Sequence, residues 1–144
     1  MEPTGASRRT LRPGRPEDAT AVVGLWKAAG AEPTVTDDPD SIQALLRHDP
    51  EAVVVVEVDG EVVGAAIAGW DGWRGNLYRL AVHPSYRRQG LGRALVAEAE
   101  RRLSACGARR VNALVVRADG QATTFWEAAG YPFDDHMHRH VKTL

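Results

Sequence analysis

Two runs rich in β-branched residues, joined by a two-residue turn, constrain the fold of this chain more than any other feature. Residues 52–58 contain five valines, and residues 61–68 continue with valine, isoleucine and alanine. Asp59 and Gly60 lie between the runs, and both residue types tolerate the positive φ angles of a tight hairpin turn. The pattern predicts a β-hairpin, so the chain must be built around a sheet.

Helical and extended patterns surround this hairpin. Apolar spacing predicts four helices, over 16–29, 40–48, 90–106 and 122–129. Further strands are expected over 10–12, 76–82 and 111–116, with a terminal strand around Val141. Adjacent strands followed by strand–helix alternation indicate an α/β fold, of the α+β type with a mixed sheet and helices on both of its faces.

Length and composition are those of one ordinary domain. A chain of 144 residues is typical of a single domain, which we expect over 10–144 after a flexible tail over 1–9. The single cysteine, Cys106, excludes an internal disulfide and a multi-cysteine metal site. The longest apolar run is far shorter than the ~18 residues of a membrane span, and no secretory signal is recognisable at the start. We therefore expect a cytoplasmic, reducing setting and no membrane partner.

The charge balance is nearly even, with 18 basic and 19 acidic residues and a net charge of −1. A chain that binds nucleic acid strongly usually carries a basic excess, so this balance argues against a nucleic-acid partner. However, sixteen of the 18 cations are arginines, whose planar guanidinium suits phosphate and carboxylate groups. The position of these arginines therefore matters more than their sum.

Arginine and glycine gather in one segment, between a predicted strand and the longest predicted helix. Gly90 and Gly92 stand at the helix start, after Arg87 and Arg88. The first turn of a helix offers unpaired N–H groups and the positive end of the helix dipole. Because glycine lets a phosphate approach the backbone closely and arginine adds charged donors, the segment predicts a diphosphate-binding site.

Two known phosphate motifs do not fit this segment. A Walker P-loop needs Gly-Lys-Ser/Thr, whereas Gly92 is followed by Arg93 and Ala94. A dinucleotide fingerprint needs a glycine where Leu95 stands. A nucleotide-binding regulator is therefore disfavoured, while a plain glycine turn with solvated arginines stays open.

A family resemblance offers a third interpretation of the same segment. The pattern Arg87-x-x-Gly90-x-Gly92, after a Leu-x-Val-x-Pro run, resembles the acetyl-CoA signature of the GNAT superfamily of N-acetyltransferases. The segment from Thr10 to Asp18, the hairpin, and the segment from Phe125 to Tyr131 resemble other parts of that family in the right order. The chain is thus similar to the small, stand-alone bacterial members.

The resemblance implies both a fold and a reaction. The implied fold has a central, mostly antiparallel twisted sheet of about six or seven strands, with about four helices on its two faces. Its fourth and fifth strands splay apart, and the pantetheine arm of acetyl-CoA lies in the gap as an added strand. The implied reaction transfers an acetyl group from acetyl-CoA to a primary amine of a small molecule or peptide, by direct attack on the thioester. A non-catalytic acyl-CoA-binding or sensing module of the same fold is the alternative, and a homodimer is common among similar proteins.

The resemblance also implies which residues contact the cofactor. The main-chain N–H groups of the glycine segment would bind the pyrophosphate, and the N–H of Val82 would donate to the oxyanion. The expected cofactor-binding residues are Leu80, Ala81, Val82, Arg87, Arg88, Gln89, Gly90, Leu91, Gly92, Arg93, Asp119 and Trp126.

The usual acid and base of the family are missing. A Glu on the fourth strand is replaced by Asn76, and the late Tyr by Trp126. Tyr78 is one catalytic candidate, since strand periodicity predicts that it shares a face with Leu80 and Val82; a packing aromatic is the alternative.

A second catalytic candidate lies in the turn before the fourth strand. Asp71 stands between Trp70 and Trp73, and aromatics beside a carboxylate can hold an organic ammonium group. A plain turn-forming aspartate is the alternative.

The last feature is a histidine alternation near the C-terminus. His136, His138 and His140 would share one face of a strand and could bind a metal. We expect an exposed terminal strand and no metal site.

Overall fold

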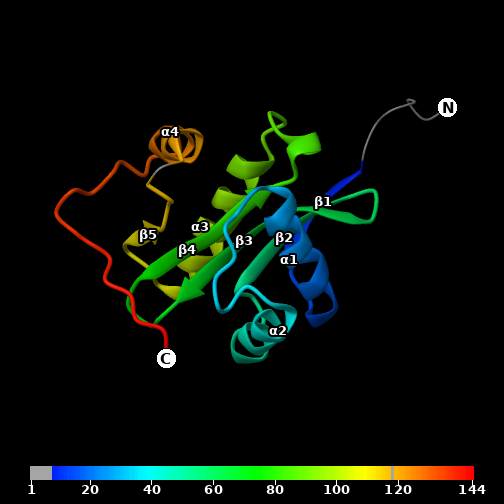
Figure 1. Ribbon diagram of the computed structural model, residues 1–144, viewed down its shortest axis with the longest axis horizontal. Helices are drawn as coiled ribbons and strands as arrows, with labels where there is room; N and C mark the ends of the chain where they lie inside the picture. The colour runs from blue at the N-terminus through cyan, green and yellow to red at the C-terminus, as the bar shows by residue number, and fades with distance from the viewer. Residues whose placement is uncertain (1–7, 118) are drawn as a thin grey trace.

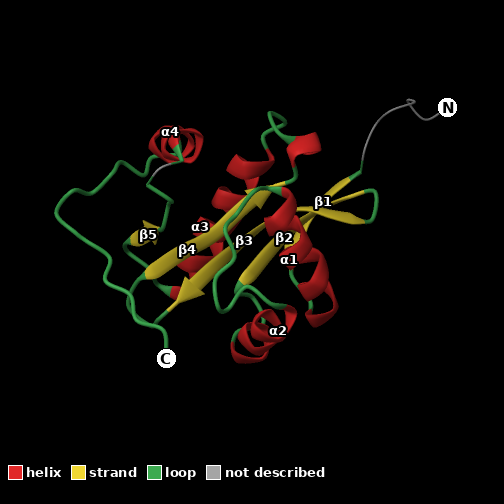
Figure 2. Ribbon diagram, viewed as in Figure 1, coloured by secondary structure: helices red, strands yellow, loops and turns green. Residues whose placement is uncertain are grey.

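The computed structural model describes residues 8–117 and 119–144, and within them the chain forms one five-stranded sheet. The strands lie side by side in chain order, and they are β1 (Arg9–Pro13), β2 (Val53–Val58), β3 (Glu61–Trp70), β4 (Gly75–Val82) and β5 (Val111–Ala113). The first four strands pair antiparallel, and β5 joins β4 in parallel. Figures 1 and 2 show the resulting twisted sheet crossing the middle of the molecule.

Helices cover both faces of this sheet. They are α1 (Ala19–Ala28), α2 (Pro39–His48), α3 (Leu91–Cys106) and α4 (Gly120–Ala128), with two 3-10 turns, η1 (Pro16–Asp18) and η2 (Pro84–Tyr86). The first two helices pack on one face, and α3 packs on the other. α4 follows β5 and adds the buried Trp126 to the α3 side of the core. The predicted α/β class is confirmed.

The central hairpin supplies the core on both faces. Val53 and Val55 of β2 pack towards α1 and α2, whereas Val54 and Val56 pack towards α3. All four are buried, as a continuous run of β-branched residues predicts for a strand covered on both sides. The predicted turn is present, since Asp59 and Gly60 adopt φ angles of 50° and 84°.

The sheet has fewer strands than we expected, and the prediction of a terminal strand around Val141 is wrong. Residues 132–144 form neither helix nor strand, and β5 ends at Ala113 rather than at residue 116. At the start of this segment the Asp134 carboxylate accepts the N–H of His136 at 3.0 Å, a local turn that competes with strand pairing. His138 and His140 are exposed as expected, although not on a strand.

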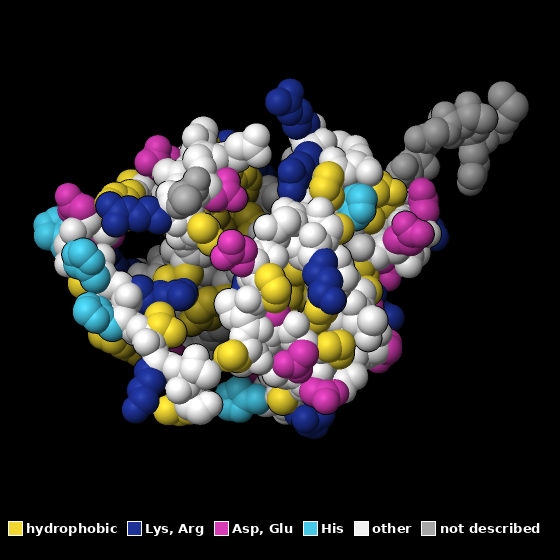
Figure 3. Space-filling model, viewed as in Figure 1, with side chains coloured by type: hydrophobic (Ala, Val, Ile, Leu, Met, Phe, Trp, Pro, Cys, Tyr) yellow, Lys and Arg dark blue, Asp and Glu magenta, His cyan; other side chains and the backbone are white. Residues whose placement is uncertain are grey.

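The C-terminal segment bows away from the body of the protein. Figure 3 shows a hollow between the two, with lysine or arginine side chains exposed inside it. The predicted tail over 1–9 falls mainly on residues 1–7, which lie outside the described residues, and Arg9 already belongs to β1. In the part of the chain that the structure describes, no helix combines the length and hydrophobicity needed to cross a membrane.

A glycine in β3 allows the hairpin and α3 to pack closely. A Cβ atom on Gly64 would lie 2.6 Å from Cγ1 of Val56 and 3.1 Å from Cδ1 of Leu95. We expect Gly64→Ala to lower the free energy of unfolding by about 1–3 kcal/mol, because the added methyl overpacks the core. Urea denaturation measures this change. As a control, Gly24→Ala in α1 meets no atom within 4 Å and should raise stability by about 0.5–1 kcal/mol; equal effects at both positions would contradict this account.

Candidate active site

The strands β4 and β5 pair over only part of their length. Pairing joins Gly75–Leu77 to Val111–Ala113, and the last contact is the Leu114 N–H donating to the Leu77 carbonyl at 3.1 Å. No further pairing on that side of β4 occurs in the described residues. The second half of β4 therefore borders an open gap, which is the splay that the resemblance implied.

Val82 presents its backbone to this gap. The His83 N–H donates to the Val63 carbonyl of β3 at 2.8 Å, and neighbouring residues of an antiparallel strand direct their N–H and C=O groups to opposite sides. The N–H and C=O of Val82 therefore point away from β3. In agreement, Nε of Arg87 donates to the Val82 carbonyl at 3.4 Å. Ala81, in contrast, pairs with Ala65 of β3 and buries its side chain on the α1 side, so the structure does not bring it to the gap.

A β-bulge changes the face on which the candidate Tyr78 lies. Ile67 pairs with Tyr78 and Ala65 with Ala81, so Arg79 and Leu80 together face a single residue of β3. Arg79 adopts a φ angle of 54°, which a non-glycine residue adopts only at a cost in strain.

The extra residue breaks the alternation along β4. Leu80 and Val82 pack on the α3 side of the sheet, whereas Tyr78 shares the face of its partner Ile67, which packs on the α1 side. The predicted common face of Tyr78, Leu80 and Val82 is therefore wrong. Tyr78 lies directly before the bulge and is 37% exposed.

The loop before α3 has the backbone of an anion site. Arg88 and Gly90 adopt φ angles of 64° and 78°, and no side chain caps the helix. Within the described part of the chain, none of the N–H groups from Arg88 to Arg93 donates to a protein acceptor. Such N–H groups, at the positive end of the helix dipole, bind negatively charged groups. Leu91 anchors the loop, since its side chain is buried under the helix start.

A cavity of about 480 Å³ opens beside this loop. Its lining residues are Arg87, Arg88, Gly120, Gln121 and Thr124, so it lies between the loop and the first turns of α4. This volume is in the range of small-ligand pockets. Sequence analysis missed Gln121 and Thr124, because a spacing of three on a short helix does not reveal which loop that helix approaches.

Contacts from distant parts of the chain fix the loop. Nη1 of Arg9 donates to the Gln89 carbonyl at 3.0 Å, and Nη2 donates to Oε1 of Gln89 at 2.8 Å. The guanidinium of Arg87 also donates to the carbonyl of Ala29, which follows the end of α1, at 3.4 Å. Arg87 therefore ties the loop to α1 and β4, while Arg88 and Arg93 are exposed.

Phe125 closes the space between the loop and the gap. A Cβ atom on Gly92 would lie 3.2 Å from Cε2 of Phe125 and 4.0 Å from Cγ2 of Val82. A larger residue at position 92 would press on this ring, so glycine lets the ring lie close against the helix start. The next residue, Trp126, is 7% exposed and packs edge-to-face on Phe125 and Tyr131, with centroid distances of 5.4 and 5.1 Å. Trp126 is therefore part of the core behind the cavity.

Asp119 positions the helix that borders the cavity. It is the N-cap of α4, and its Oδ1 accepts the N–H of Ala122 at 3.0 Å. A capping aspartate satisfies a helix N–H that would otherwise lack a partner. The structure thus gives Asp119 a part in placing Gly120 and Gln121 at the cavity.

Asp71 lies at the other end of β4, away from these residues. Its Oδ1 accepts the N–H groups of Trp73 and Arg74 at 2.8 and 2.7 Å, and these hydrogen bonds, that of Arg74 first, lower the pKa of the Asp71 carboxyl. The Arg74 guanidinium covers the Trp73 ring at 4.0 Å from its centroid, where an organic ammonium was expected. Asp71 is a turn former in this fold, and its carboxylate is occupied by the backbone of its own turn.

A sheet that opens beside a glycine loop at a helix start is the arrangement that the GNAT resemblance implied. In agreement, residues 20–131 match the family model described as the Acetyltransferase (GNAT) family, and the chain belongs to that family. Acetyltransferase SG1711 of Sodalis glossinidius is 38% identical over 128 residues, covering 88% of this chain and 89% of the relative. Acetyltransferase ECA0875 of Pectobacterium atrosepticum is 39% identical over 108 residues, covering 75% and 76%.

Solved structures share the fold. Ard1 from Thermoplasma volcanium has a TM-score of 0.76 at 24% identity, over 85% of this chain and 81% of that one. The aminoglycoside N-acetyltransferase AAC(6')-Iy in complex with CoA has a TM-score of 0.76 at 18% identity, over 99% and 100%. The GNAT resemblance and the predicted class of enzyme, an N-acetyltransferase, are confirmed.

The cap of α4 can be tested apart from cofactor binding. Asp119→Ala should lower the free energy of unfolding by about 0.5–2 kcal/mol, because the Ala122 N–H loses its acceptor. Asp119→Ser keeps a cap oxygen and should recover most of that stability. Urea denaturation measures stability, and calorimetric titration measures acetyl-CoA affinity. Weak acetyl-CoA binding by a stable Asp119→Ser would show a direct contact instead of a positioning role.

Proposed function

We propose that this chain transfers an acetyl group from acetyl-CoA to a primary amine of a small molecule or peptide, in the gap between β4 and β5. One observation carries the proposal. The backbone N–H groups from Arg88 to Arg93 have no acceptor among the described residues, and they lie beside a cavity of about 480 Å³. A diphosphate fits that donor set, because its oxygens accept several N–H groups and its charge complements the helix dipole.

Two structural neighbours support the amine acceptor. The diaminobutyrate acetyltransferase EctA from Paenibacillus lautus, in complex with L-2,4-diaminobutyric acid and coenzyme A, has a TM-score of 0.71 at 20% identity, over 85% of this chain and 77% of that one. AAC(6')-Iy is also known in complex with a bisubstrate analogue, with a TM-score of 0.72 at 18% identity, over 96% of this chain and all of that one. By analogy, we propose that the acyl acceptor of this chain is also an amine. We further propose a cytoplasmic setting, which its single cysteine suggests.

The backbone of this chain would perform most of the binding. When bound, acetyl-CoA supplies an acyl group that its thioester makes reactive. The loop from Arg88 to Arg93 would hold the pyrophosphate, and Leu80 and Val82 would line the pantetheine arm. The Val82 N–H, free of β3, would donate to the acyl oxygen as negative charge develops there.

Proton transfer must use groups other than the usual pair. Asn76 cannot act as a base, and its Oδ1 accepts a hydrogen bond from Nδ2 of Asn112 at 3.2 Å, across the closed end of β4 and β5. Trp126 is buried, and its indole N–H is a donor that is too weakly acidic to protonate a thiolate. Tyr78 carries the hydroxyl group on β4 next to the bulge, so we assign it the transfer of a proton to the leaving thiolate. The amine would lose its proton to water.

The pyrophosphate site predicts a loss of affinity on added negative charge. Gly92→Glu should weaken acetyl-CoA binding at least about 100-fold, because it places a carboxylate at the helix start beside Phe125. Isothermal titration measures the affinity. Gly92→Ala separates the effect of bulk against Phe125 from the effect of charge, and Gly24→Glu in α1 is a control of equal charge. Unchanged affinity in Gly92→Glu would contradict the site.

The reaction can be tested with a panel of primary amines. Release of free CoA should accompany turnover of at least one amine, and Tyr78→Phe should lower kcat about 100-fold while KM for acetyl-CoA stays near the parent value. The phenylalanine keeps the ring that packs near Gly69. Tight acetyl-CoA binding without CoA release on any amine would instead establish an acyl-CoA sensor, and an unchanged kcat would remove Tyr78 from the mechanism.

A further inference from the structure

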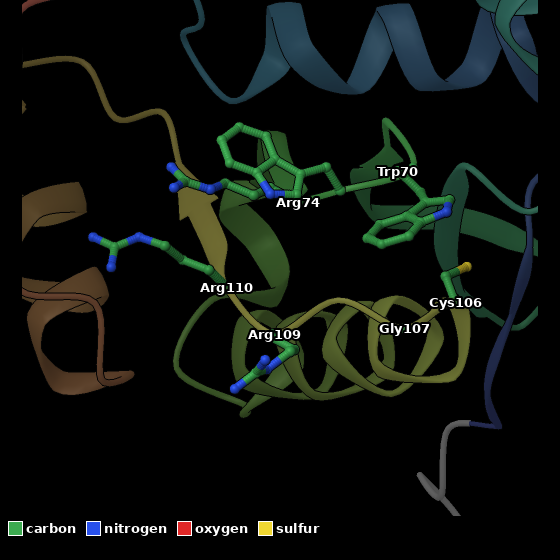
Figure 4. Close-up of a pocket in the computed structure, with 8 residues that line it drawn as sticks. Trp70, Arg74, Cys106, Gly107, Arg109 and Arg110 are labelled. Carbon is green, nitrogen blue, oxygen red and sulfur yellow. The ribbon is translucent and has the colours of Figure 1, made fainter.

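A second and larger cavity lies at the opposite end of β4. Its volume is about 650 Å³. Its side-chain lining comes from Trp70, Trp73, Arg74, Cys106, Arg109 and Arg110. None of the lining residues is acidic, although the chain has more acids than bases. Three guanidinium groups and two indoles therefore surround one cavity (Figure 4).

Sheet register places two of these arginines side by side. Gly75 pairs in parallel with Val111, and the Gly75 N–H donates to the Arg110 carbonyl at 3.0 Å. The residues just before that pair, Arg74 and Arg110, are therefore neighbours, and Figure 4 shows their guanidinium groups extending in the same direction. In the described residues neither group forms an ion pair or a side-chain hydrogen bond.

The dipole of α3 explains only part of the positive charge at this cavity. Arg109 and Arg110 follow the C-terminus of α3, where cations offset the partial negative charge of the helix dipole. Arg74 comes from the β3–β4 turn instead, and its guanidinium stacks on Trp73. Two separate elements thus direct positive charge to the same cavity.

The indoles add flat apolar surface. Trp73 is 70% exposed, and Trp70 is half-buried where β3 ends. Indole faces stack on nucleobases, a contact worth about 1–3 kcal/mol per base. At the end of α3 the Leu103 and Ser104 carbonyls accept the N–H groups of Gly107 and Ala108. The next two carbonyls lie beyond the last intrahelical bond and can accept hydroxyl or amino donors.

We propose that this cavity binds a nucleoside phosphate. Arg74 and Arg110 hold the phosphate groups, the indoles stack on the base, and the end of α3 accepts hydrogen bonds from the ribose. The volume lies in the range of ligand pockets. The site needs no Walker or dinucleotide loop, and it is independent of the proposed acetyl-CoA site, since the eight residues of β4 separate the two.

Cys106 gives a direct measurement of occupancy. It is the single cysteine of the chain, it is exposed, and it lines the cavity. The experiment follows alkylation of Cys106 by neutral iodoacetamide with increasing ATP, with no other thiol or nucleotide in the solution. ATP should slow alkylation at least about tenfold, and pyrophosphate should protect only at much higher concentration because it lacks a base.

Matched variants decide where ATP binds. Arg74→Gln and Arg110→Gln should each raise the ATP concentration for half-protection about tenfold or more, since each removes a charge-assisted contact to phosphate. Arg101→Gln removes the same charge from an exposed position of α3 and should leave protection unchanged.

The proposal would be overturned by no protection at millimolar ATP, by equal loss of protection in all three variants, or by equal protection with pyrophosphate. Protection that survives Arg74→Gln but disappears in Gly92→Glu would place ATP at the helix start and would also overturn it. Failure of acetyl-CoA to bind leaves these readouts intact, so the two proposals fail separately.

Discussion

The unequal pairing of β4 is the constraint on which the rest of this structure depends. One edge of β4 pairs with β3 along the whole strand, whereas the other edge meets β5 over three residues only. Backbone groups that β5 leaves unpaired must find another partner, since a buried N–H without one is costly. The bulge at Arg79 and Leu80 turns the strand at this point. We propose that a ligand with amide groups, lying along Leu80 and Val82, would satisfy backbone groups of this half of β4.

Distant segments converge to hold the opening in shape. Arg9 of β1 fixes the backbone of Gln89, and Asp119 caps the helix that carries Phe125 to Gly92. The guanidinium of Arg79 pairs with Asp37 and reaches the Glu32 carbonyl, so the loop between α1 and α2 is tied to the bulge itself. Each border of the site is thus attached to a different element, which is the arrangement that a preorganised binding site needs.

The sequence predicted those features that depend on local chemistry. The hairpin, the helices and the anion-binding loop before Leu91 each follow from residues adjacent in the chain. The face of Tyr78 could not be predicted in this way, because a one-residue bulge reverses the alternation and leaves no mark in local periodicity. Likewise, the contact of Arg9 with Gln89 joins residues 80 apart. Asp71 and the two tryptophans near it have the composition of a binding site, but the Asp71 carboxylate accepts backbone N–H groups of its own turn.

The arginines fall into two groups, those in structural ion pairs and those that line the two cavities. Arg12 lies between Asp18 and Glu57 at 2.7 Å from each carboxylate and holds the pKa of Asp18 below its usual range, while Arg102, buried in α3, pairs with Asp49. These carboxylates are committed to structural ion pairs, so they do not neutralise the arginines at the two cavities. A net charge of −1 therefore coexists with two cationic sites. Long-range attraction of a polyanion depends on the sum of charges, but recognition of one phosphate group depends on the nearest few, and screening over about 10 Å separates the two effects.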